Sequence, residues 1–158
     1  MYLIDISNIF VSNKLKMIEL PSQTIFYTIE KSIKGYRRFA QRNLNETIED
    51  ITIDQALLLI FLNNHSGLSQ SRIGELIFKD NASVTRMIEL MTKKNYLKRS
   101  INKTDRRKYN LSITEKGKKT LANLNTIIAS NRKSILEGIS DNEINELKNT
   151  LTKIIHNC

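Results

Sequence analysis

Residues 69–95 read SQSRIGELIFKDNASVTRMIELMTKKN, and this stretch predicts two short helices joined by a tight turn. Ser69 and Asp80 each stand at the start of a helical segment, where an N-cap residue is expected. Asn95 follows the second segment, and asparagine tolerates the left-handed backbone that often ends a helix. Two capped helices in succession predict a helix-turn-helix unit.

The second helix, within residues 80–95, is amphipathic. Its apolar side chains recur at spacings of three and four and share one face: Val84, Met87, Ile88 and Met91. Small and charged side chains occupy the opposite face: Ala82, Arg86, Glu89 and Lys93. We therefore expect the first face to pack in the core and the second to remain available to a partner.

The next part of the chain predicts a hairpin. Residues 96–100 and 108–113 each read as a strand, and Tyr109 and Leu111 share a face by the strand period of two. The connection over residues 101–107 is too long for a tight hairpin turn, so it is expected to project. Helix, turn, helix and hairpin in this order predict a winged helix-turn-helix.

Further helices are expected on both sides of this unit. A long one begins at Ser22 as N-cap, and residues 51–64 form a short one that is apolar nearly all round and therefore buried. Thr114 caps a helix that runs to about Glu137, and a last helix begins at Asp141. The fold class is therefore mainly α with a small two-stranded β wing.

Two of these outer helices carry apolar faces. The stripe on the first consists of Phe26, Ile29, Ile33, Tyr36 and Ala40. The seam on the last consists of Ile144, Leu147, Leu151 and Ile154. Together they offer more apolar helix surface than one small lobe can cover, which favours a homodimer.

Positive charge is concentrated in the middle of the chain. The net charge is +9, and the pI is about 9.7. Between Ser69 and Thr120 there are fourteen Lys and Arg against five Asp and Glu, while the remaining residues cancel at eleven against eleven. Six of these cations lie within residues 98–108, opposed only by Asp105. Such a local excess predicts a polyanionic partner.

A double helix suits this arrangement. The major groove admits a helix whose first residues reach base edges, and a narrow A·T-rich minor groove attracts arginine. Arg106 and Arg107 at the hairpin tip fit the second role. The candidate DNA-binding residues are Ser69, Gln70, Arg72, Asn81, Ala82, Ser83, Thr85, Arg86, Lys93, Lys103, Asp105, Arg106, Arg107 and Lys108.

The order and wording of three segments resemble the multiple-antibiotic-resistance regulator (MarR) family of winged-helix transcription factors. The segments are ITIDQ, GLSQSRIGELIFKDNASVTRMIELMTKKNYLKR and TDRRKYNLSITEKG. The resemblance implies that Arg107 enters the minor groove while Asp105 holds it in place. Thr85 and Arg86 match the Thr-Arg pair of the family's recognition helix.

The chain departs from the family's pattern in the turn before this helix. Phe78 stands where the family often has glycine, and Lys79 where it often has an apolar residue. Asn95 replaces a usual glycine, which its tolerance of the left-handed conformation makes benign. The turn is therefore the part that the resemblance determines least.

The resemblance also implies a helical dimerisation part, residues 22–48 and 115–156, beside the DNA-binding part, residues 51–113. It further implies a small-molecule pocket, for which Tyr36 and Phe39 are candidates. The expected function is that of a sequence-specific, homodimeric repressor that a small ligand releases from a pseudo-palindromic operator. The alternative is a winged-helix module for protein or RNA contacts without sequence-specific readout of DNA.

Several other classes of protein are disfavoured. No nucleophile–base pair, glycine-rich phosphate loop or carboxylate dyad is present, so neither an enzyme nor a cofactor is expected. His65 and His156 have no neighbours at metal-ligand spacing, so no metal site is expected. Cys158 is the single cysteine, and no apolar run reaches membrane-spanning length. We therefore expect a cytoplasmic protein.

Overall fold

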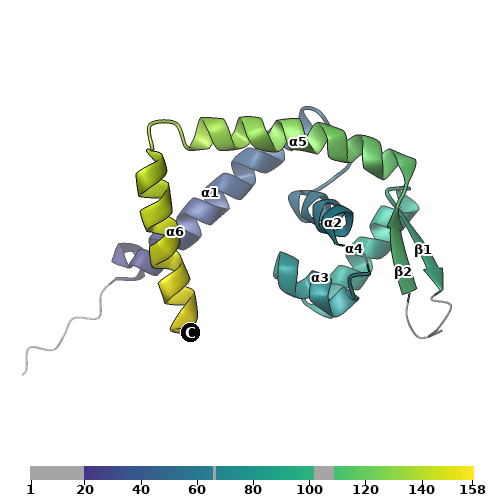
Figure 1. Ribbon diagram of the computed structural model, residues 1–158, viewed down its shortest axis with the longest axis horizontal. Helices are drawn as coiled ribbons and strands as arrows, with labels where there is room; N and C mark the ends of the chain where they lie inside the picture. Colours follow the sequence, from purple (N-terminus) through teal and green to yellow (C-terminus); the bar gives the residue numbers. More distant parts are fainter. Residues whose placement is uncertain (1–19, 66, 102–108) are drawn as a thin grey trace, which may run out of the picture. The chain divides into compact units, whose positions relative to one another are not determined.

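The computed structural model describes residues 20–65, 67–101 and 109–158 (Figure 1). After a 3-10 turn at Pro21–Gln23, the described elements are α1 (Ile25–Asn45), α2 (Ile53–Asn64), α3 (Gln70–Ile77), α4 (Asn81–Lys93), β1 (Leu97–Ile101), β2 (Tyr109–Ile113), α5 (Glu115–Ile135) and α6 (Asp141–His156). The expected class, mainly α with a two-stranded wing, is confirmed. Contacts divide the chain within α1 into two units, residues up to Gly35 and residues from Tyr36 to Cys158.

Most helix boundaries follow the predicted caps. The Ser69 hydroxyl accepts a hydrogen bond from the Arg72 amide at 3.1 Å, and the Thr114 hydroxyl accepts one from the Gly117 amide at 3.2 Å. Asn95 has a φ of 62°, the left-handed conformation expected of it. Side chains near the ends of the helices therefore define the element borders locally.

One predicted cap is wrong. Ser22 lies inside the 3-10 turn that Pro21 begins, and the hydroxyl of Thr24 accepts the hydrogen bond from the Tyr27 amide at 3.2 Å. Thr24 also donates to the Pro21 carbonyl at 2.8 Å. Proline has a φ suited to this short turn, so the regular α-helix begins only after it.

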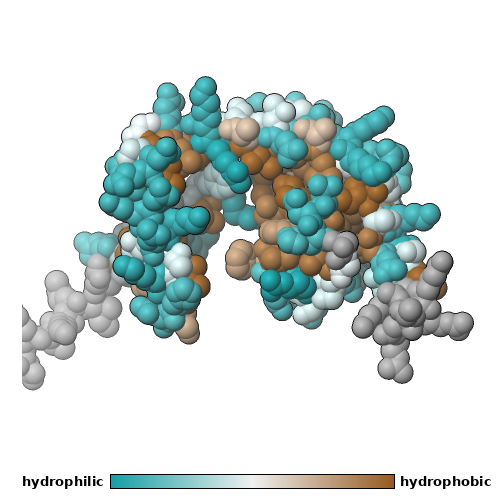
Figure 2. Space-filling view, viewed as in Figure 1, coloured by the Kyte–Doolittle hydropathy of each residue, from teal (hydrophilic) through white to brown (hydrophobic). Residues whose placement is uncertain are grey.

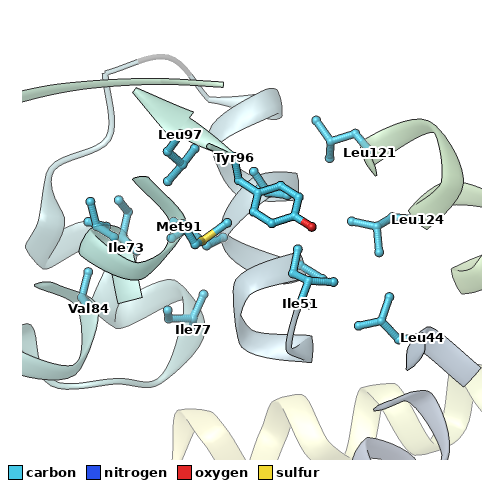
Figure 3. Close-up of a cluster of buried hydrophobic side chains, with 14 residues drawn as sticks. Leu44, Ile51, Ile73, Ile77, Val84, Met91, Tyr96, Leu97, Leu121 and Leu124 are labelled. Carbon is cyan, nitrogen blue, oxygen red and sulfur yellow. The ribbon is translucent and has the colours of Figure 1, made fainter. Parts of the chain in front are cut away.

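The core lies within the second unit and takes side chains from five helices and the wing (Figure 3). Leu58 and Leu59 of α2 are fully buried, and the same core cluster contains residues of α1, α3, α5 and β1: Leu44, Ile73, Ile77, Leu97, Leu121 and Leu124. Burying one such side chain contributes roughly 1.5–3 kcal/mol. In α4, the predicted apolar face is confirmed by the burial of Val84, Ile88 and Met91.

The turn between α3 and α4 is compact. Phe78 takes the left-handed conformation, with φ 56° and ψ 49°, and the Lys79 amide donates to the Gly74 carbonyl at 2.9 Å. A Cβ at Gly74 would lie 2.6 Å from the Lys79 carbonyl oxygen, so a side chain is excluded there. Phe78 therefore keeps the backbone conformation that glycine favours, although its side chain is 91% exposed.

The hairpin joins the core at its base. β1 and β2 pair antiparallel in a register that sets Leu97 against Ile113 and Ile101 against Tyr109. Leu97 is buried, whereas Ile101 and Tyr109 at the far end are 63% and 49% exposed. The expected projection of residues 101–107 falls almost wholly on residues outside the described part.

Tyr96 joins the base of the wing to two other elements. Its side chain is buried, and its hydroxyl donates to the Asp50 carboxylate in the connection before α2. The Lys116 ammonium at the start of α5 lies 3.4 Å from Asp50 Oδ2 and 4.1 Å from the Tyr96 ring centroid. Burial and the hydrogen bond to Asp50 raise the pKa of Tyr96 to about 12, while the same bond lowers the pKa of Asp50.

In the part of the chain that the structure describes, no helix has both the length and the apolar content needed to cross a bilayer.

We predict that Tyr96→Phe lowers the free energy of unfolding by about 1 kcal/mol at pH 7, because a hydrogen bond to a partly solvated carboxylate is lost. A folded-state pKa of about 12 lies above the ordinary value of 10, so the neutral phenol stabilises the fold below pH 10 and this contribution is lost between pH 10 and 12. Urea unfolding between pH 10 and 12 should show that the difference in free energy of unfolding between wild type and variant becomes smaller as the pH rises. Tyr109→Phe, at an exposed site, is the control and should show no such gap.

We predict that Phe78→Gly raises the free energy of unfolding by about 1 kcal/mol, because glycine relieves the cost of a left-handed residue with a Cβ. Asn95→Gly is the matched control, since asparagine already tolerates this conformation, and its gain should be smaller. Thermal and urea unfolding measure both variants. A loss of stability in Phe78→Gly would show that the exposed ring stabilises the turn.

Candidate nucleic-acid interface

The outward face of α4 is open to solvent. Asn81, Ala82, Arg86 and Lys93 are exposed along it, and Glu89 shares the same face. Among the described residues, neither Arg86 nor Glu89 forms an ion pair. The buried face of the helix holds this polar face outward, so a partner can reach it without rearrangement of the core.

Some of the predicted reading residues are already engaged at the start of α4. Asp80 Oδ1 accepts from the Ser83 amide at 2.8 Å, and the Ser83 hydroxyl donates to Asp80 Oδ2 at 2.7 Å. These bonds lower the pKa of Asp80. The Thr85 hydroxyl donates to the Asn81 carbonyl at 2.9 Å. Ser83 and Thr85 are therefore limited to accepting bonds, while the side chains of Asn81 and Arg86 extend from the surface.

The start of α3 presents a different kind of contact. Ser69 caps the helix, Gln70 is half-buried, and Arg72 is exposed. The Arg72 guanidinium pairs with Glu75 Oε2 at 2.6 Å, and both side chains are 60% exposed. Exposed pairs of this kind contribute little, so Arg72 can exchange Glu75 for a phosphate at small cost. This end of α3 suits contact with the backbone of a duplex.

The described strands of the wing carry a pair that the sequence alone did not reveal. The Arg99 guanidinium lies 3.6 Å from the centroid of the Tyr109 ring. The register places Tyr109 opposite Ile101, so Arg99 and Tyr109 are diagonal neighbours on one face of the hairpin. The strand period of two predicts the face on which each of these side chains lies. That Arg99 contacts Tyr109 follows only from the pairing of the two strands.

Five predicted contacts at the wing tip lie outside the described residues: Lys103, Asp105, Arg106, Arg107 and Lys108. Their placement against a minor groove stays a prediction.

The predicted ligand residues lie on α1. Tyr36 and Phe39 are half-buried, and the Arg42 guanidinium lies 6.0 Å from the centroid of the Phe39 ring. A hollow of about 520 Å³ on the same helix has other lining residues: Arg38, Gln41, Arg42, Asn45 and Glu46. Within the described ranges, no cluster of three or more His, Cys, Asp or Glu side chains could hold a metal ion. A pocket at Tyr36 and Phe39 stays a prediction.

The sequence matches a known family. Residues 51–109 match the model of the MarR family, which spans α2 to the first residue of β2. The HTH-type transcriptional regulator SarZ of Staphylococcus aureus is 28% identical over 132 residues, covering 82% of this chain and 85% of SarZ.

Solved structures share the fold. In the S. aureus MepR–DNA complex, the similar chain has a TM-score of 0.75 at 21% identity, covering 87% of this chain and 99% of that one. BpsR of Bordetella bronchiseptica, whose DNA binding is regulated by 6-hydroxynicotinic acid, has a TM-score of 0.77 at 18% identity, covering 87% and 96%. A MarR transcriptional regulator from Methanosarcina mazei Go1 has a TM-score of 0.68 at 26% identity, covering 83% and 96%.

These matches agree with the order of elements in the structure. They also agree with the prediction that the chain is not an enzyme, because SarZ and the MarR family are transcriptional regulators. Over residues 51–109 the chain is therefore similar to the MarR family of winged-helix transcription factors.

Proposed function

We propose that the protein is a sequence-specific DNA-binding repressor that acts as a homodimer and is released by a small molecule. The observation that carries this proposal is the exposed face of α4, with Asn81 and Arg86 projecting from a segment whose charge excess is +9 between Ser69 and Thr120. The MepR relative, whose structure is that of a DNA complex, supports the choice of duplex DNA as partner.

Contacts with DNA divide by chemistry. An arginine can bond a guanine edge with two hydrogen bonds, and an asparagine can do the same with adenine, so Arg86 and Asn81 are suited to the major groove. Arg72 and the amides at the start of α3 are suited to phosphates. Asp80 places a negative charge at the start of α4, which disfavours a phosphate there and favours a base edge.

The dimer is supported by apolar surface that the single chain leaves uncovered. In α6 none of the residues is buried, and Leu147 and Ile155 are 59% and 70% exposed. In the separate first unit, Phe26 and Ile33 are 64% and 54% exposed. Brown hydrophobic atoms remain visible between polar ones in Figure 2. Exposed apolar faces of this kind are typical of protein–protein interfaces, and the proposed partner is a second copy of the chain.

Release by a ligand follows from the two-fold arrangement. Two copies of α4 can enter successive major grooves only at one separation. A ligand that binds better to another separation shifts the population away from DNA. Regulation of the BpsR relative by 6-hydroxynicotinic acid supports an effector of small size, and Tyr36 and Phe39 are the proposed contacts.

The first test is Arg86→Ala. After selection of a preferred duplex from random sequences, we expect the variant to lose about 1–3 kcal/mol on that duplex and much less on duplexes changed at the base it reads. Competition binding by fluorescence anisotropy measures both. Lys93→Ala is the matched control on the same face, and we expect a uniform loss together with a shallower salt dependence.

A uniform loss in Arg86→Ala would reassign this side chain to phosphate contact. Binding by the wild type without preference for any duplex would favour the alternative of a module for protein or RNA contacts.

The second test is Leu147→Lys in the centre of α6. In the proposed dimer this substitution places a charge in an apolar interface, so we expect the dimer dissociation constant to rise about a hundredfold or more. Sedimentation equilibrium measures the association state. Leu90→Lys on α4, where the leucine is 50% exposed, is the control and should leave association unchanged. Equal dimerisation of Leu147→Lys and wild type would exclude α6 from the interface.

A further inference from the structure

Asp54 bridges two cations from different elements. It lies in the first turn of α2, and its side chain is only 18% exposed. Its Oδ1 accepts from the Arg37 guanidinium of α1, and its Oδ2 lies 3.1 Å from the Lys79 ammonium. One carboxylate therefore joins α1, the start of α2 and the turn before the recognition helix.

The Lys79 end of this bridge lies beside the cap of α4. Lys79 precedes Asp80, whose carboxylate accepts from the Ser83 amide at 2.8 Å. The Lys79 amide is fixed by the Gly74 carbonyl at 2.9 Å, and Gly74 has no room for a side chain. Because the backbone on both sides is held, the ion pair between Lys79 Nζ and Asp54 connects the start of α2 to the residue that precedes the cap of α4.

The α1 end is fixed one helical turn away as well. Gln41 Oε1 accepts from the Ile53 amide at 2.8 Å, and Gln41 Nε2 donates to the Ile51 carbonyl at 3.1 Å. Arg37 and Gln41 lie four residues apart and therefore share a face of α1. This part of α1 consequently holds the start of α2 by charge and by amide hydrogen bonds.

Electrostatics favour a role in positioning over a large role in stability. The side chains of Arg37 and Lys79 are 40% and 39% exposed, so solvent screens both attractions. The Asp54 carboxylate is also favoured by the N-terminal dipole of α2. Without its charge, two cations would face each other across a neutral side chain, and Lys79 would turn to solvent.

We propose that Asp54 is a positioning residue for DNA recognition, because it fixes Lys79 and with it the first turn of α4 relative to α1. This inference rests on the proposed function. On this proposal, Lys79 forms an ion pair within the protein and does not contact the DNA backbone. Lys79 stands where the family often has an apolar residue. Movement of α1 is then transmitted to the residues that read bases.

A double-mutant cycle tests this assignment, with the full-length chain, the selected duplex and a scrambled duplex. Asp54→Asn and Lys79→Met should each lower the ratio of the two affinities about fivefold, and the double variant should be no worse than either single one. Lys79→Arg should retain the ratio of the wild type. Glu115→Gln with Lys118→Met is the control cycle, because it removes an exposed pair of the same charges at 2.7 Å on α5.

Salt titration and melting curves distinguish a positioning role of Lys79 from a phosphate contact and from a loss of folding. A positioning role leaves the salt dependence of Lys79→Met equal to that of the wild type, whereas loss of a phosphate contact makes its slope shallower by about one. Additive losses in the cycle, or a shallower slope, would overturn the inference. Since methionine keeps most of the length of the lysine side chain without its charge, the melting curve of Lys79→Met should match the wild type even if Asp54→Asn melts earlier.

A wild-type protein that selects no duplex would instead overturn the proposed function, and the inference would end with it. Selection by the wild type together with an additive cycle would overturn the inference alone.

Discussion

Burial of one face of α4 is the constraint on which the rest of the structure depends. Val84, Ile88 and Met91 lie in the core, and this leaves the helix only one orientation about its axis. Arg86 and Asn81 are consequently exposed. The hydrophobic effect thus determines which polar side chains of α4 face solvent. The positive charge of the segment is added to a surface that core packing has already exposed.

The electrostatic pattern then distinguishes two ends of the helix-turn-helix. The start of α3 is capped by a neutral serine and carries Arg72, whereas the start of α4 is capped by the anionic Asp80. A phosphate is favoured at the first end and disfavoured at the second. The framework charges Arg37, Asp54 and Lys79 are paired in one bridge and add little to this contrast.

Structural features that depend on residues within one or two helical turns of each other could be predicted from the sequence. Caps at Ser69, Asp80 and Thr114, the amphipathic face of α4 and the left-handed Asn95 are local features, and all agree with the structure. The error at Ser22 is also local, because a 3-10 turn after Pro21 competes with an immediate α-helix. Contacts between distant segments, such as Tyr96 with Asp50 or Asp54 with Lys79, follow only from the tertiary fold.

The last helix has a consequence for assembly. α6 is locally well specified, since Ser140 and Glu143 form a reciprocal capping box at its start, yet none of its residues is buried in the single chain. In the proposed homodimer, each copy already carries a complete α4 face, and pairing through α6 sets the spacing between the two faces. At concentrations where most of the protein is monomeric, the dimer concentration grows with the square of the total protein concentration. Occupancy of an operator with two half-sites would then grow in the same way, so a modest rise in expression would switch the promoter sharply.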